Sequence, residues 1–134
     1  MPLIQTRGDP MHLRVFFSAE PADPAIDLDD LARRMAATVH RPVNAAPYLR
    51  GAEMELPCRN GVIDEADAGD VAAQLARFGE ALGREDGGGR VGVNIWITAA
   101  QAEDISGINL PSIVVNAAAA LGADIDISLA VAPA

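Results

Sequence analysis

Four segments of this chain alternate apolar and polar residues, and this pattern constrains the fold more than any other feature. The segments are Met11 to Ala19, Ala52 to Cys58, Arg90 to Thr98 and Asp124 to Val131, and 43–51 is expected from its composition to be a loop. A period of two residues is typical of a β-strand with one buried face. Strands covered by helices on both faces show continuous apolar runs instead. The sequence therefore predicts a sheet that helices cover on one side only.

The segments between the strands carry the spacing and end signals of helices. Asp27 and Asp67 are predicted to cap the first and second helices, because their carboxylates can accept from free backbone N–H groups. Pro111 suits the first turn of a third helix, and Gly122 suits the position just past its end. The apolar stripes consist of Leu28, Leu31, Ala32, Met35 and Val39 in the first helix and Val71, Leu75, Phe78 and Leu82 in the second.

The predicted fold class is α/β (α+β), a two-layer sandwich of a four-stranded mixed sheet with three helices packed on one face. Residues 1–10 are expected to be a flexible leader, and 11–134 a single globular α/β domain, because the first ten residues lack apolar periodicity and end in a Gly-Asp-Pro turn signal. The predicted core consists of Leu13, Val15, Phe17, Leu31, Met35, Leu75, Phe78, Val93, Ile95, Ile97, Leu121, Ile125 and Ile127.

Charge and cysteine content exclude several classes of partner. Nineteen acidic residues against ten arginines, with no lysine, give a net charge of −9. Such a chain is a poor ligand for nucleic acid phosphates or acidic membranes, which need clustered cations. The single Cys58 cannot form an internal disulfide, and residues 1–10 do not resemble a signal peptide. An alanine-rich, lysine-free composition is typical of a GC-rich bacterial genome, so a bacterial cytoplasmic location is expected.

Several segments run through the chain in a distinctive order, namely MHLRVFFSA, IDLDDLARRM, a strand ending in ELP, VGVNIWIT and NLPSIVVNAAAALGADIDISL. In this order the chain resembles the DUF4279 family of small bacterial domains of unknown function. The resemblance covers most of 11–131, and its strongest part is the ending at 121–126. The chain departs from the family pattern at Ser128-Leu129, where an aromatic residue is usual, and in lacking an aromatic residue in the second strand.

The family has no established activity, so the resemblance implies no catalytic residue. Its members are similar in context to immunity proteins and small accessory genes of bacterial competition systems. The resemblance therefore implies a small domain that acts through a protein partner.

The outward sides of the four strands define a candidate binding face. Two large aromatic residues among several carboxylates are typical of a recognition surface, in which aromatic anchors lie within a polar rim. A solvated sheet with aromatic residues packed on their cross-strand neighbours would show the same pattern. The predicted partner-binding residues are Arg14, Phe16, Glu53, Glu55, Asn94, Trp96, Asp124 and Asp126, with His12 and Ser128 on the same face.

Catalytic and metal chemistry find little support in the sequence. The paired acids of the outward face could hold a hard cation, but no contiguous ligand loop is present. Cys58 lies on the inward side of its strand, and neither His12 nor His40 lies in a catalytic motif. The glycines at 87–89 precede a strand, whereas phosphate loops precede a helix. No catalytic residue, metal or cofactor is therefore predicted.

Two functions remain open. The first is a non-catalytic protein-binding domain, an immunity-type or regulatory partner of a bacterial toxin or enzyme, whose partner has a basic surface because the chain is acidic. The alternative is a small enzyme or ligand-binding domain that uses the polar face around Arg14, Trp96 and Asp126.

Overall fold

The two longest alternating segments form the centre of the sheet. Strand β1 (Met11–Pro21) and strand β6 (Gly89–Ala99) pair antiparallel along their whole length. The computed structural model describes residues 11–45, 47–59, 61–86, 89–104 and 107–131. The predicted leader at 1–10 lies outside the described residues.

The main sheet is mixed and has five strands in the order β2-β3-β1-β6-β7. Strand β7 runs parallel to β6, and the other neighbouring pairs are antiparallel. The remaining members are β2 (Val43–Ala45), β3 (Leu49–Leu56) and β7 (Asp124–Val131), and a second, two-stranded sheet consists of β4 (Cys58–Arg59) and β5 (Val62–Ile63). The mixed α/β class is confirmed, whereas the prediction of four strands is wrong because 43–51, expected to be loop, contains β2 and the start of β3.

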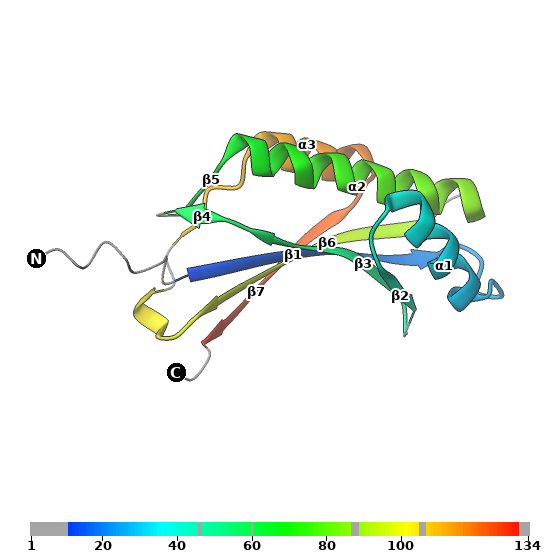
Figure 1. Cartoon of the computed structure of the whole chain (residues 1–134), viewed down its shortest axis with the longest axis horizontal. Helices are drawn as coiled ribbons and strands as arrows, with labels where there is room; N and C mark the ends of the chain where they lie inside the picture. Colours follow the sequence, from blue (N-terminus) through cyan, green and yellow to red (C-terminus); the bar gives the residue numbers. More distant parts are fainter. Residues whose placement is uncertain (1–10, 46, 60, 87–88, 105–106, 132–134) are drawn as a thin grey trace, which may run out of the picture.

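Three α-helices and one short 3₁₀ helix complete the described part of the chain. They are α1 (Leu28–Val39), α2 (Glu65–Asp86), α3 (Ser112–Ala120) and the 3₁₀ helix η2 (Ala102–Asp104). In Figure 1, α2 and α3 lie together on one side of the sheet, and α1 lies near β2 at one end. Within the described ranges, none of these helices combines the length and the apolarity needed to cross a bilayer.

The predicted N-terminal cap is confirmed for α1 but not for α2. The Asp27 side chain accepts from the N–H groups of Asp29 and Asp30, so the predicted cap of α1 is confirmed. Helix α2 begins at Glu65, before the predicted cap Asp67, because the Ala68 N–H donates to the Asp64 carbonyl at 2.9 Å.

The third helix closes as its glycine predicts. Gly122 has a positive φ of 63°. Its N–H donates to the Ala119 carbonyl at 3.0 Å, and the Ala123 N–H donates to the Ala118 carbonyl at 2.9 Å. This pair of hydrogen bonds satisfies carbonyls that would otherwise lack partners at the helix end.

One hydrophobic core lies between the inward side of the sheet and the helices. Of the predicted core, Leu121 and Ile125 are only partly buried. Ile127 is 52% exposed, so its predicted burial is wrong. It lies on β7, the last strand of the sheet, and helix α3 leaves it uncovered. The predicted core residues that the structure confirms as buried are Leu13, Val15, Phe17, Leu31, Met35, Leu75, Phe78, Val93, Ile95 and Ile97.

Gly51 lies where β3 passes close to Pro42 and Val43. It is opposite Phe17 on β1 and Val43 on β2, and the β1–β3 register shifts between Val15 and Phe17. A Cβ atom at Gly51 would lie 2.6 Å from the Pro42 carbonyl oxygen and 2.8 Å from Val43 Cγ2. Only glycine therefore allows this close approach of the two strands.

Gly51→Ala is expected to destabilise the chain by about 1–3 kcal/mol, because the backbone must move to relieve the overlap. The matched control is Gly69→Ala in α2, where nothing lies within 4 Å of the added Cβ. That substitution is expected to stabilise the helix by about 0.5–1 kcal/mol, because alanine loses less backbone entropy on folding. Urea unfolding of both variants tests this pair, and a Gly51→Ala variant as stable as the parent contradicts the close approach.

Candidate functional site

The strand register brings the predicted binding residues together on one face. Arg14 lies opposite Glu55 on one side and Trp96 on the other, and Trp96 in turn lies opposite Ser128. The next row places Phe16 opposite Asn94, and Asn94 opposite Asp126. These side chains lie on the face of the sheet opposite the core, here called the open face. Its residues are His12, Arg14, Phe16, Glu53, Glu55, Asn94, Trp96, Asp124, Asp126 and Ser128.

Arg14 forms its ion pair with a carboxylate that is not its direct cross-strand partner. Glu55 is the cross-strand partner of Arg14, yet Arg14 Nη1 lies 3.3 Å from Glu53 Oε1. Both side chains of this ion pair are more than half exposed. Exposed pairs of this kind contribute about 0–1 kcal/mol, so the pair orients the Arg14 guanidinium more than it stabilises the fold.

Phe16 was predicted to be an exposed aromatic anchor, and the structure buries it to 4% exposure. The guanidinium carbon of Arg50 lies 3.8 Å above the centroid of the Phe16 ring. The Trp96 ring lies on another side, with its centroid 6.0 Å away and its plane tilted by 51°. Phe16 is thus covered by a cation–π contact and an aromatic contact. The prediction that it is presented on the surface is wrong.

Arg50, which covers Phe16, is a further residue on the side of the open face, and the sequence did not predict it. The composition of 43–51 predicts a loop at Arg50, whereas Arg50 lies in β3 opposite Ser18 of β1. Leu49 and Gly51 are buried and Arg50 is exposed, so the alternation that marks a strand is present there. The bulge after Gly51 shifts the alternation, because Met54 and Leu56 continue the buried side at even positions.

Trp96 is the large aromatic side chain that remains on the open face, with 43% of its surface exposed. It borders a hollow of about 320 Å³ that it shares with His12, Leu13, Arg14, Glu55 and Thr98. An aromatic wall with a cation, a carboxylate and an imidazole around it can bind a partner's side chain by stacking and by charge.

Other polar residues of the open face form a hydrogen bond within the sheet or line a second hollow. The Asn94 amide nitrogen donates to Ser18 Oγ at 3.1 Å, and the pair is partly buried, which gives Asn94 a structural contact. Asp124 and Asp126 are exposed and line a smaller hollow of about 210 Å³ with Tyr48 and Arg90. In the described part of the chain, no three His, Cys, Asp or Glu side chains lie close enough together to hold a metal ion.

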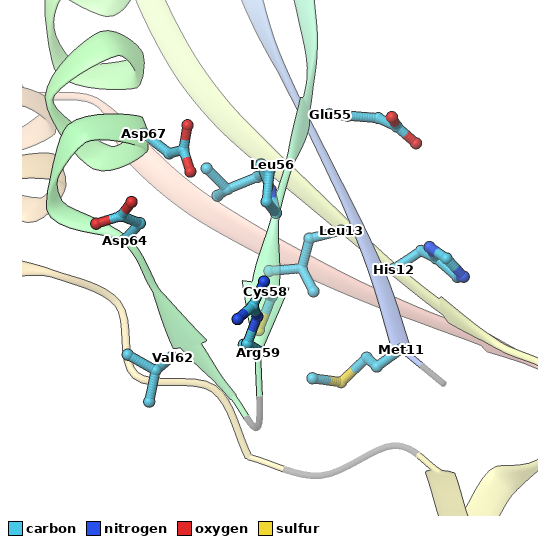
Figure 2. A pocket seen from close by; sticks show the side chains of 11 residues that line it. Met11, His12, Leu13, Glu55, Leu56, Cys58, Arg59, Val62, Asp64 and Asp67 are labelled. Carbon is cyan, nitrogen blue, oxygen red and sulfur yellow. The ribbon is translucent and has the colours of Figure 1, made fainter. Parts of the chain in front are cut away.

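A larger pocket of about 650 Å³ lies at the start of β1 and the end of β3, beside the small sheet and the start of α2. Figure 2 shows Asp64 and Asp67 on one side of the strands, and His12 and Glu55 directed to the other. Cys58 is buried, and Figure 2 shows the His12 ring directed away from it. The pocket therefore does not join Cys58 and His12 into a nucleophile and its base.

Known proteins add no constraint to this geometry. No family model, curated protein or solved structure matches the chain. The resemblance to the DUF4279 family stays a prediction, and the function has to be argued from the open face itself.

Proposed function

We propose that this chain is a non-catalytic protein-binding domain that holds its partner against the open face of the sheet. The observation that carries the proposal is Trp96, a tryptophan that is 43% exposed on the open face and lies between Arg14 and Ser128. Tryptophan and arginine are the residue types most enriched at binding hot spots, where they are surrounded by polar residues that exclude water. Trp96 and Arg14 lie side by side in this arrangement.

The proposed architecture is a two-layer sandwich in which the helices cover one face and leave the other for a partner. Phe16 supports this face from below, because its ring contacts Trp96 and lies under Arg50. The Phe16 ring beside Trp96 is thus held in place before a partner arrives. A preorganised anchor loses less conformational entropy on binding than a mobile one.

The proposed partner is a protein with a basic surface, such as a bacterial toxin or enzyme that the domain inhibits or regulates in the cytoplasm. A net charge of −9 attracts a basic partner over distances of about 8–10 Å at physiological salt. The exposed carboxylates Glu53, Glu55, Asp124 and Asp126 place part of this charge on the open face.

Trp96→Ala is expected to weaken the complex about 30-fold, which corresponds to about 2 kcal/mol, chiefly through faster dissociation. The measurement is surface binding kinetics with the partner captured from the organism that encodes the chain, at two salt concentrations. Association should slow as salt rises, because the carboxylates steer the encounter.

The matched control is Arg77→Ala, an exposed position on α2 away from the open face, which should bind like the parent. Circular dichroism confirms that both variants are folded. If Arg77→Ala loses binding while Trp96→Ala keeps it, the partner binds the helices and the proposal is wrong.

The hollow beside Trp96 supports one alternative function, that of a small enzyme or ligand-binding domain. Its volume of about 320 Å³ is at the lower end of small-molecule sites, and Arg14 and Glu55 supply polar groups. A small molecule that co-purifies with the chain and is lost in Trp96→Ala, with no stoichiometric protein captured, favours this alternative.

A further inference from the structure

The exposed apolar side chains of this protein gather on its last helix and strand. Helix α3 exposes Ile113 and Val115, and β7 exposes Ile127, Leu129 and Val131, of which Leu129 is 61% exposed. In the described part of the chain, only Val62 and Trp96 are further large apolar side chains with such exposure. Figure 1 shows the C-terminal end of β7 well away from α2 and α3.

Strand β7 is also an open edge. It is the last strand in the order β2-β3-β1-β6-β7, so its outer N–H and C=O groups have no strand beside them among the described residues. The opposite edge, β2, has only three residues, and short edge strands resist pairing with other chains. β7 has eight residues, an unbroken register with β6, and no lysine, proline or bulge. Apart from the charges of Asp124 and Asp126, the usual protections of an edge strand are absent from it.

The charges on β7 are arranged so that the strand can pair with itself. Asp124 and Asp126 occupy its first half on the open face, and Ser128 and Ala130 occupy the second half of the same face. In an antiparallel pair, opposite residues share a face, and the two strands run in opposite senses. The acidic half of one copy then meets the neutral half of the other.

Only some registers achieve this separation. A two-fold axis at Ile127 places Asp126 opposite Ser128 and Asp124 opposite Ala130, and an axis at Ser128 also keeps the carboxylates apart. An axis at Asp126 or at Ile125 sets carboxylates directly against each other, which is unfavourable. The favourable registers also bring Ile127 against an apolar side chain, either itself or Leu129.

We propose that β7 is a dimerisation edge, on which a second copy of this chain pairs antiparallel around Ile127 and Ser128. The pairing satisfies the free backbone groups of both edges and buries the apolar side chains of β7 against each other. The two sheets become one continuous sheet with both open faces on the same side. Because Trp96 lies opposite Ser128, the two Trp96 side chains come close to the two-fold axis.

The dependence of dimerisation on salt should be opposite to that of binding to a basic partner. Each copy carries a net charge of −9, so two copies repel each other at long range. Screening this repulsion should strengthen the dimer as salt rises, whereas a complex with a basic partner should weaken.

Sedimentation equilibrium of the full chain over a hundredfold range of concentration, at low and high salt, tests the proposal. The parent is expected to shift from monomer to dimer with concentration, and more strongly at high salt. Ile127→Lys and Leu129→Lys should each weaken the dimer by more than roughly tenfold, because they place a charge in the apolar contact. Both positions are more than half exposed in the monomer, so the fold should tolerate lysine there.

The matched control is Val62→Lys, at an apolar residue of β5 that is 57% exposed and away from this edge. This variant should dimerise like the parent. A chain that stays monomeric under every condition overturns the proposal, as does a dimer that persists in both folded β7 variants. Association that weakens with salt, or that continues to larger oligomers, also contradicts a closed pairing of two acidic copies. None of these outcomes depends on the partner proposed for the open face.

Discussion

Phe78→Ala is expected to lower the free energy of unfolding by about 3–5 kcal/mol. Phe78 is fully buried in α2, and its ring centroid lies 5.7 Å from that of Phe17 on β1, at an interplanar angle of 55°. The substitution removes this contact between the longest helix and the central strand and leaves a cavity that rigid neighbours cannot fill. Because a domain of this size has a net stability of about 5–15 kcal/mol, a large share of it is lost.

Urea unfolding followed by circular dichroism measures this loss. The matched control is Arg77→Ala, the preceding residue of the same helix, whose side chain is exposed. It should change the free energy of unfolding by less than about 0.5 kcal/mol. Equal denaturant midpoints for Phe78→Ala and the parent would mean that α2 presents a different side to the sheet.

The central strands and the first helix were predictable because their signals are local. In β1 and β6 buried positions alternate with more exposed ones over most of each strand, and Phe16 of β1 is the exception because it is buried on the open face. Helix α1 begins where Asp27 accepts from two N–H groups, an interaction within four consecutive residues. Periodicity and capping need no knowledge of strand order, so they could be assigned from sequence.

The first part of β3 could not be predicted because its pattern depends on the contact with β2 and on the bulge opposite β1. Gly51 has no side chain, and its tight packing follows from the approach of Pro42 and Val43. The bulge that follows changes the parity of the buried positions, so a single alternating pattern does not run from Leu49 to Leu56. The sequence therefore predicts a loop at Arg50, although its guanidinium covers Phe16.

The exposure of Ile127 shows a second limit, which is strand order. Ile95 and Ile127 are opposite each other on the same side of the sheet, and their sequence contexts both alternate. Ile95 is fully buried because β6 lies between two strands and under helices, whereas Ile127 lies on the edge. Periodicity identifies the side that a residue faces, but only the strand order decides whether anything covers that side.

Phe16→Ala is expected to cost about 3 kcal/mol of stability, although Phe16 faces away from the main core. Its ring is covered by Arg50 and Trp96, so truncation leaves a gap beneath two side chains of the open face. Trp96 is the single tryptophan of the chain, and its fluorescence should shift to the red as water reaches the space that Phe16 leaves.

The matched control is Arg14→Ala on the same strand and face, which should cost less than about 1 kcal/mol because its ion pair with Glu53 is exposed. If Phe16→Ala is as stable as the control and Trp96 emission is unchanged, Phe16 is an exposed surface residue after all. The expected result instead makes Phe16 the support of the open face and leaves Trp96 as its exposed anchor.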